Sequence, residues 1–387
     1  MNTITEKRPH IWLSTAHFIN DIYTGMLNPI MPFIAAKLGI SMAIATVVLS
    51  VSHICSSLLQ PVFGFFADNI LKRVFIFWGL MFTAVFISFA PSVSHLSILI
   101  LFVILGSLGS SLFHPQALGF SVRFASADTG KSMGTFIAMG TFGYSLGPVV
   151  SAFVTQFTGL NNMPYLCLIG VIWALFMFKF VPKISDGIVE RTHSEFIKAF
   201  KDIFSNYRLK LLILISILKS LITTSTSILL PFLWRDMGYM PFKIGAALFA
   251  FSFMSGIGSF VSRDIEKRIG AKMVFYFSMI STFPLMIMFS LTYKSFPIIS
   301  FVIFAIMGLC TAMAMPVTMV MAQSEMPQYK SIIGGFINGF SWGVIAIFMS
   351  ALGFIAQAKG IIPVLLVVAL IPAISALFIL KRLFSTK

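Results

Sequence analysis

Apolar runs long enough to cross a lipid bilayer recur along almost the whole of this 387-residue chain. A membrane-spanning helix needs about 20 mainly apolar residues. Charged residues make up only 10% of the sequence, whereas soluble domains average roughly 25%. We place spans near 11–35, 44–67, 74–92, 96–122, 131–157, 163–181, 210–232, 243–262, 272–292, 296–322, 330–357 and 360–381. The sequence therefore predicts an all-α integral membrane protein with twelve transmembrane helices, and it excludes a soluble or disordered chain.

The basic residues fall mostly on one side of these spans. The formal net charge is +15, and with the N-terminus placed inside, 21 of the 27 Lys and Arg residues lie in cytoplasmic segments and five lie outside. Retention of Lys and Arg in short cytoplasmic loops is typical of multi-pass membrane proteins. We therefore expect both termini in the cytoplasm, and we attribute the positive charge to topology and not to nucleic-acid binding.

The longest linker, residues 182–209, divides the spans six and six. Within it, residues 194–204 place apolar side chains at helical spacing, with charged ones on the opposite face. This pattern predicts an amphipathic helix under the lipid headgroups. We therefore divide the chain into an N-terminal six-helix bundle at 1–181, a cytoplasmic linker at 182–209 and a C-terminal six-helix bundle at 210–387.

Three short motifs recur in the two halves at nearly one offset. Met31-Pro32-Phe33 matches Leu230-Pro231-Phe232, His114-Pro115 matches Met315-Pro316, and Phe136-Ile137 with Gly143 matches Phe336-Ile337 with Gly343, at offsets of 199 to 201 residues. Their common order indicates a duplicated unit of six spans. Because six is even, both copies run in the same direction, as in transporters whose parallel repeats enclose a substrate site near the middle of the membrane.

Several runs carry a family resemblance. They are His17–Asp21 in span 1, Ser56–Gly64 followed by Asp68 in span 2, Gly109–Pro115 in span 4, Phe142–Pro148 in span 5 and Ala322–Pro327 in span 10. With these motifs the chain resembles the major facilitator superfamily, and within it the fosmidomycin-resistance-type branch. The resemblance implies a bacterial inner-membrane secondary transporter that alternates between inward-open and outward-open states. It also implies proton-linked export of a small anionic or drug-like molecule.

The same resemblance assigns roles to particular residues. It implies a cytoplasmic gate after span 2, formed by Asp68, Lys72 and Arg73, in which the carboxylate pairs with basic side chains or helix N-termini. Span 5 contributes two glycines and a proline of the family motif, Gly143, Gly147 and Pro148, and the glycines permit close helix packing.

Few ionisable residues lie deep inside the predicted spans. They are His17, Asp21, His53, His114 and Lys219, and four of the five fall in spans 1, 4 and 7, which line the central cavity in the resembling fold. Charges in the bilayer interior cost roughly 2.5–3.5 kcal/mol on insertion scales and usually face a cavity. His53, in the outer half of span 2, is interpreted as a packed polar residue.

His17 and Asp21 are four residues apart and therefore share one helix face. A carboxylate and imidazoles in a gated cavity exchange protons as hydration changes, so we expect proton coupling through Asp21, His17 and His114. The alternative is a purely structural hydrogen bond between spans 1 and 4. We expect Lys219, Asn20 and His114 to bind the substrate. Lys219 either meets an anionic group of that substrate or pairs with Asp21 across the two halves.

Other classes of function fit the sequence less well. His17 and Asp21 are one residue short of the H-x4-D arrangement of membrane acyltransferases, and the serine-elbow, HExxH and phosphate-loop motifs do not occur. Cys55, Cys167 and Cys310 each stand alone in an apolar run. We therefore expect no enzymatic activity, no metal and no cofactor. The expected partners of this monomer are a small-molecule substrate, protons and lipid. Import of a metabolite or siderophore, and a transport-inactive receptor, stay as alternatives.

Overall fold

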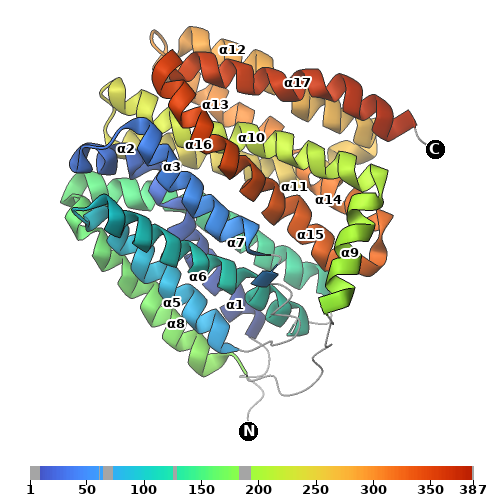
Figure 1. The fold of residues 1–387 in the computed structure, drawn as a ribbon, viewed down its shortest axis with the longest axis horizontal. Helices are drawn as coiled ribbons and strands as arrows, with labels where there is room; N and C mark the ends of the chain where they lie inside the picture. The colour runs from blue at the N-terminus through green and yellow to red at the C-terminus, as the bar shows by residue number, and fades with distance from the viewer. Residues whose placement is uncertain (1–8, 61, 64–72, 125–128, 183–192, 386–387) are drawn as a thin grey trace.

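A computed structural model describes residues 9–60, 62–63, 73–124, 129–182 and 193–385 (Figure 1). Its elements are α1 (Pro9–Gly25), α2 (Leu27–Leu38), α3 (Met42–His53), the π-helix η1 (Ile54–Leu58), α5 (Arg73–Phe89), η2 (Ala90–Ser92), α6 (Leu96–Arg123), α7 (Thr129–Thr158), η3 (Leu160–Leu166), α8 (Cys167–Phe180), α9 (His193–Ser205), α10 (Tyr207–Asp236), α11 (Pro241–Ile280), α12 (Thr282–Thr292), α13 (Pro297–Ala312), α14 (Ala314–Glu325), η4 (Pro327–Tyr329), α15 (Lys330–Gly334), the π-helix η5 (Gly335–Phe340), α16 (Ser341–Lys359) and α17 (Ile361–Ser385). The described chain is thus helical throughout.

The described helices form twelve membrane-crossing segments, which we call legs. Nine stretches among these residues are long and apolar enough to cross a membrane. One of them, Pro241–Thr292, counts as two legs because the chain turns at Gly270, whose φ of 81° is a left-handed value that glycine adopts readily. The pairs α1 with α2 and α3 with η1 supply the other two legs. The predicted all-α membrane fold is confirmed, although several helices extend beyond the predicted bounds.

Two of the predicted spans are broken near prolines. Helix α1 ends at Gly25, four residues before Pro29, and α13 ends at Ala312, four residues before Pro316. A proline lacks the N–H that would bond to the carbonyl four residues earlier. One backbone hydrogen bond of the helix is therefore missing at each of these positions. The first and tenth spans, each predicted as one continuous helix, are therefore pairs of helices joined at a break.

The helices gather into two groups, with α1 to α8 on one side of the molecule and α10 to α17 on the other (Figure 1). Three sets of helices join the groups: α7 packs along α11, α3 with η1 packs along α16 with η5, and α2 packs against α10 and α11. Glycines make these approaches close, because a Cβ on Gly245 would overlap the Pro148 carbonyl and a Cβ on Gly343 would overlap the Leu58 side chain.

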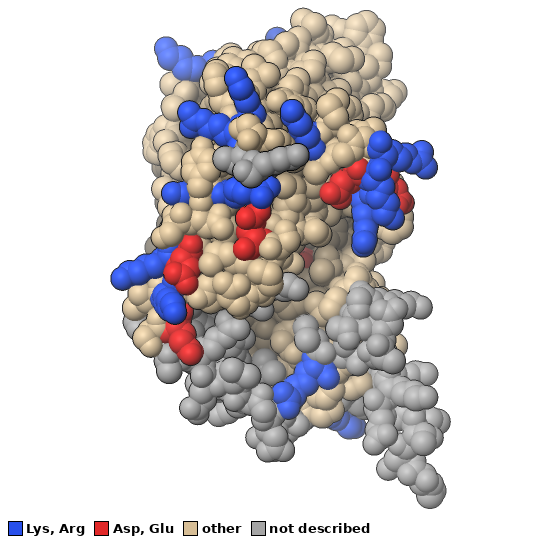
Figure 2. Space-filling view, turned by 90° about the vertical axis from the view of Figure 1, so that its right-hand side faces the viewer, with Lys and Arg blue, Asp and Glu red and all other residues tan. Residues whose placement is uncertain are grey.

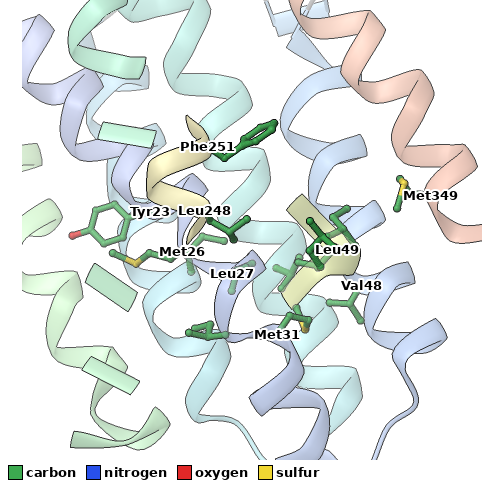
Figure 3. Close-up of a cluster of buried hydrophobic side chains, with 14 of the residues drawn as sticks. Tyr23, Met26, Leu27, Met31, Val48, Leu49, Leu248, Phe251 and Met349 are labelled. Carbon is green, nitrogen blue, oxygen red and sulfur yellow. The ribbon is translucent and has the colours of Figure 1, made fainter. Parts of the chain in front are cut away.

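An apolar cluster lies between the two groups. It is made of Leu27, Met31, Leu49, Leu248 and Met349, each at most 3% exposed. Figure 3 shows Leu248 of the second group beside Leu27 of the first, with Met349 farther away on α16. If the groups separated here, these side chains would meet water of the cavity, so their burial stabilises the closed contact by about 1.5–3 kcal/mol for each fully buried residue. The cluster therefore seals the groups together at this depth.

Hydrogen bonds also join the two helix groups at the end of the molecule opposite α9. The backbone N–H of Ala43 donates to Gln357 Oε1 at 2.9 Å, and the backbone N–H of Phe242 donates to Gln156 Oε1 at 3.0 Å. Each bond joins one helix group to the other and satisfies a backbone donor in the first turn of a helix, where no intrahelical acceptor exists. The two groups are thus fastened at this end.

Helix α9 contains the amphipathic segment that the linker sequence predicts. Ala199 and Ile203 on its apolar face are buried. The hydroxyl of Tyr329 donates to Asp202 Oδ2 at 2.9 Å, and the Phe204 ring meets the Phe336 ring at 5.4 Å between centroids. Asp202, expected on the polar outer face, is therefore a contact to η4. Helix α9 is attached to the second helix group.

Cysteines placed at 194 in α9 and at 236 at the end of α10 should be reached from opposite sides of the membrane. The 30 residues of α10 separate them, a length of about 45 Å at 1.5 Å per residue. In a background with Cys55, Cys167 and Cys310 changed to Ser, an impermeant maleimide added to intact cells should label Asp236→Cys. Ser194→Cys should label only after permeabilisation. Labelling of both from outside would contradict the topology.

Candidate transport site

A cavity of about 2350 Å³ lies between the two helix groups. Its wall includes Asp21 and His114 from the first group and Lys219 from the second. Glu195 and Lys198 of α9 also line it, so the cavity opens at the α9 end of the molecule. Figure 2 looks onto this end, where Lys and Arg side chains gather. The cavity is thus open at one end and closed by the apolar cluster toward the other.

Three ionisable side chains meet on one wall of the cavity. Asp21 Oδ2 lies 3.2 Å from His17 Nε2, and Asp21 Oδ1 lies 3.1 Å from His114 Nε2. The two imidazole rings meet edge to face at 5.1 Å between centroids. Helix α1 supplies the first two residues one turn apart, and α6 supplies the third. The structure thus brings together the three side chains that the sequence singles out for proton coupling, and we call them the His-Asp-His cluster.

The hydrogen bonds behind the imidazoles fix which ring nitrogen carries a hydrogen. His17 Nδ1 lies 2.9 Å from the carbonyl oxygen of Phe136, and His114 Nδ1 lies 2.8 Å from the carbonyl oxygen of Ser110. A carbonyl oxygen only accepts, so each Nδ1 is the donor. A neutral ring then presents its Nε2 lone pair to the Asp21 carboxylate, which also only accepts when ionised. Each short contact therefore requires a cation between its two atoms, of which the proton is the simplest.

Asn20 lies behind the cluster. The residue is completely buried and is not one of the residues described as lining the cavity. Its amide Nδ2 donates to Asp21 Oδ1 at 3.0 Å and to Ser110 Oγ at 3.4 Å. The structure places Asn20 where it orients the carboxylate of Asp21. In this conformation it does not reach the cavity, where the sequence analysis expects it to meet the substrate.

Lys219 lies on the wall formed by the second helix group, halfway along α10, and only 6% of the residue is exposed. Among the described residues, no carboxylate oxygen lies within 4.0 Å of its ammonium group. The ion pair with Asp21, one of the two alternatives considered from the sequence, is not formed in this conformation, in which Asp21 contacts the two imidazoles on the opposite wall. Lys219 therefore presents to the cavity a buried amino group that has no carboxylate partner among the described residues.

Hydroxyl groups are scattered over the remaining wall, which is otherwise mainly apolar. They come from α3, α6, α10 and α11, and include Ser52, Ser107, Ser220, Thr223, Ser227 and Ser255. Some donate to their own helix, as Ser255 Oγ does to the Phe251 carbonyl at 2.8 Å. A hydroxyl that donates in this way keeps lone pairs for another partner. The wall therefore offers hydrogen-bonding groups within a mainly apolar surface.

The expected gate is only partly described. Asp68 and Lys72 lie outside the described residues. Arg73 Nη1 donates to the carbonyl of Val181 at 2.9 Å, and the guanidinium lies 4.7 Å from the ring centroid of Phe178. Both contacts are within the first helix group. In this conformation Arg73 therefore fastens the start of α5 to the end of α8.

Three residues of α7, which the family motif assigns to helix packing, lie at close helix contacts. A Cβ on Gly143 would overlap the carbonyl oxygen of Phe18 in α1, and a Cβ on Gly147 would overlap that of Ile22. The carbonyl of Pro148 lies against Gly245 of α11. Helix α7 is thereby wedged between α1, which carries the His-Asp-His cluster, and the second helix group.

Sequence reasoning missed the groups that hold the imidazoles. Ser110 stands one helical turn before His114, so its place beside that ring was readable from the spacing. The Phe136 carbonyl was not, because any residue offers the same acceptor. Gly140 was missed as well, although a Cβ there would overlap the His17 ring. Contacts between spans 1 and 5 depend on tertiary packing that no local pattern encodes.

Solved transporter structures share this arrangement of helices. A mutant of the nucleoside transporter NupG matches with a TM-score of 0.77 and 16% identity, over 97% of this chain and 100% of that one. A POT family transporter in complex with 5-aminolevulinic acid matches with a TM-score of 0.74 and 13% identity, over 99% and 98%. At these identities the likeness concerns the fold.

Two relatives match along nearly the whole sequence. The chain is 25% identical over 375 residues to the fosmidomycin resistance protein of Escherichia coli (strain K12), and 22% identical over 377 residues to the uncharacterised MFS-type transporter YfnC of Bacillus subtilis (strain 168). Each match covers 95% of this chain and 91% of the relative. The resemblance drawn from the motifs is thus confirmed. The family model of the Major Facilitator Superfamily matches residues 13–347, and the chain belongs to this superfamily of membrane transporters.

Proposed function

We propose that this protein exports a small anionic or drug-like molecule across the bacterial inner membrane in exchange for protons. The observation that carries the proposal is the cavity between the helix groups, open at one end, with the His-Asp-His cluster on one wall and Lys219 on the other. A site between two halves that rock about it is the basis of alternating access. The halves are residues 1–181 and 210–387, and the open end, with α9 and both termini, faces the cytoplasm.

Proton coupling is supported by the hydrogen bonds of the cluster. The two contacts of Asp21 with imidazole nitrogens need protons, while the Nδ1 atoms of His17 and His114 keep theirs for carbonyl oxygens. Protons that enter or leave the cluster change its net charge inside a cavity of low dielectric. That change alters the free energy of closing the cavity, which is how coupling arises.

The substrate class is supported by charge and by one relative. Lys219 places a cation in the cavity wall, and a fixed positive charge raises the local concentration of anions. The relative from Escherichia coli is named for resistance to fosmidomycin, which is a phosphonate and therefore an anion. Lys219 and His114 are the side chains we assign to the substrate, and we reassign Asn20 to holding Asp21.

Proton-driven transport should depend on Asp21. Proteoliposomes with an acidic interior should take up labelled fosmidomycin, and Asp21→Asn should abolish this uptake, because the amide holds no exchangeable charge between the imidazoles. Exchange of substrate without a gradient should persist. Asp236→Asn, an exposed carboxylate at the end of α10, is the matched control and should transport at the wild-type rate. Wild-type uptake by Asp21→Asn would place the coupling site elsewhere. Absence of uptake for fosmidomycin, organic acids and siderophores alike would contradict the proposed substrate class.

Lys219 should discriminate by substrate charge. Lys219→Gln should weaken binding of fosmidomycin roughly tenfold to a hundredfold, because a charge-assisted hydrogen bond is worth about 1.5–3 kcal/mol. Lys219→Arg should retain part of the affinity. Binding of an uncharged phosphonate diester should change little in either variant, and Lys210→Gln, an exposed lysine on the same helix, should leave both affinities unchanged. Equal losses for the charged and neutral compounds would make Lys219 a structural residue.

Substitution of Gly140 should impair transport by displacing the His17 ring. Gly140→Ala places a methyl group where the His17 ring lies, so the ring must move away from Asp21. Proton-driven uptake should fall at least tenfold, the scale of about 1.4 kcal/mol in the barrier. Gly134→Ala on the same helix meets nothing within 4 Å and should be silent. In a His17→Gln background, Gly140→Ala should add little further loss. Additive losses in the double variant would show that Gly140 acts independently of His17.

A further inference from the structure

We propose that His17, Asp21 and His114 form a binding site for a divalent transition-metal ion of the zinc, cobalt and nickel class. The ligand atoms of these three side chains all lie within 4.8 Å of one another, and all three residues line the cavity. Metal binding at the His-Asp-His cluster does not depend on the identity of the transported substrate or on the direction of transport.

The donor set suits such an ion. Two imidazole nitrogens and one carboxylate are the ligands that zinc takes in many open sites, and imidazole also suits cobalt and nickel. Bonds of about 2.0–2.2 Å place neighbouring ligand atoms about 3–3.5 Å apart. Asp21 Oδ2 to His17 Nε2 and Asp21 Oδ1 to His114 Nε2 already measure 3.2 and 3.1 Å. These two distances run to different oxygens of Asp21, so an ion held by all three side chains takes the carboxylate as a bidentate ligand or draws the side chains together by rotation.

The groups behind the ligands are arranged as they are behind metal-binding histidines. The Nδ1–H of His17 donates to the Phe136 carbonyl and that of His114 to the Ser110 carbonyl, so both Nε2 lone pairs point toward Asp21. Metal-binding histidines almost always donate the second ring N–H to a carbonyl or carboxylate, which fixes the tautomer and the ring orientation. Here both rings are fixed in this way by main-chain acceptors from α6 and α7.

The charge of the cluster and its access to the cavity also suit a divalent ion. With two lone pairs facing one carboxylate, a single divalent ion replaces the protons of both contacts. Three protein ligands leave at least one coordination position for water or for a ligand atom from the cavity, as in open zinc sites. Lys219 lies in the same cavity and favours anions. The site therefore fits a metal ion alone or one held by a small anionic chelator.

Cobalt(II) tests the proposal without any substrate. The full-length transporter, purified in detergent with a histidine-free affinity tag, is titrated with Co²⁺ while visible absorption bands are recorded, and bound Co²⁺ is then displaced with Zn²⁺. We expect one Co²⁺ per chain. His114→Gln and Asp21→Asn should each weaken binding at least tenfold, because loss of outer-shell partners alone costs 10–100-fold. Elution as a monodisperse species in size-exclusion chromatography checks that each variant is folded.

His53 supplies the matched control, because it lines the same cavity outside the cluster. His53→Gln should bind Co²⁺ as the wild type does. Absence of Co²⁺ binding in the wild type, or unchanged binding in both His114→Gln and Asp21→Asn, overturns the metal site. Fosmidomycin uptake by the same wild-type preparation separates the two proposals, since uptake without Co²⁺ binding rejects only the metal site, and Co²⁺ binding without uptake rejects only the proposed substrate.

Discussion

A buried carboxylate that shares its two oxygens between two imidazoles is the interaction around which this structure is arranged. A lone charge in the middle of a membrane protein is costly, and it persists only when neighbours compensate it. Asp21 obtains that compensation from His17 one turn earlier and from His114 on α6. Close packing of α1 against α7 then brings the Phe136 carbonyl to the His17 ring. The packing of α1 against α7 therefore also sets the geometry of the His-Asp-His cluster.

The fold was readable from the sequence because its signals are local and repeated. Long apolar runs, the distribution of Lys and Arg, and the i, i+4 spacing of His17 and Asp21 each depend on neighbours along one helix. The breaks at Gly25 and Ala312 were readable in principle from the prolines four residues later, yet hydropathy alone merges the helices on either side.

Only part of the site could be predicted from the sequence, because its contacts join residues that lie far apart along the chain. His114 stands 93 residues after Asp21, and only tertiary packing shows that its Nε2 faces the same carboxylate. The expectation of no metal rested on isolated cysteines, and spacing along the chain could not show that two histidines and an aspartate from different helices converge. The burial of Asn20 depends likewise on which face of α1 turns toward α6, and that side chain could not be placed from polarity alone.

The two halves hold similar hydrogen bonds with different chemistry, at positions within one residue of equivalence in the 200-residue repeat. Where His17 Nδ1 donates to the Phe136 carbonyl, Ser216 Oγ donates to the Ile337 carbonyl at 2.6 Å, with partners offset by 199 and 201 residues. A hydroxyl keeps its proton throughout the physiological pH range. The Ser216 bond in the second half therefore does not change with pH. The bond in the first half belongs to an imidazole ring that also contacts the Asp21 carboxylate. In the first half the bond therefore positions an ionisable side chain against a carboxylate, whereas in the second half it joins two helices through an uncharged hydroxyl.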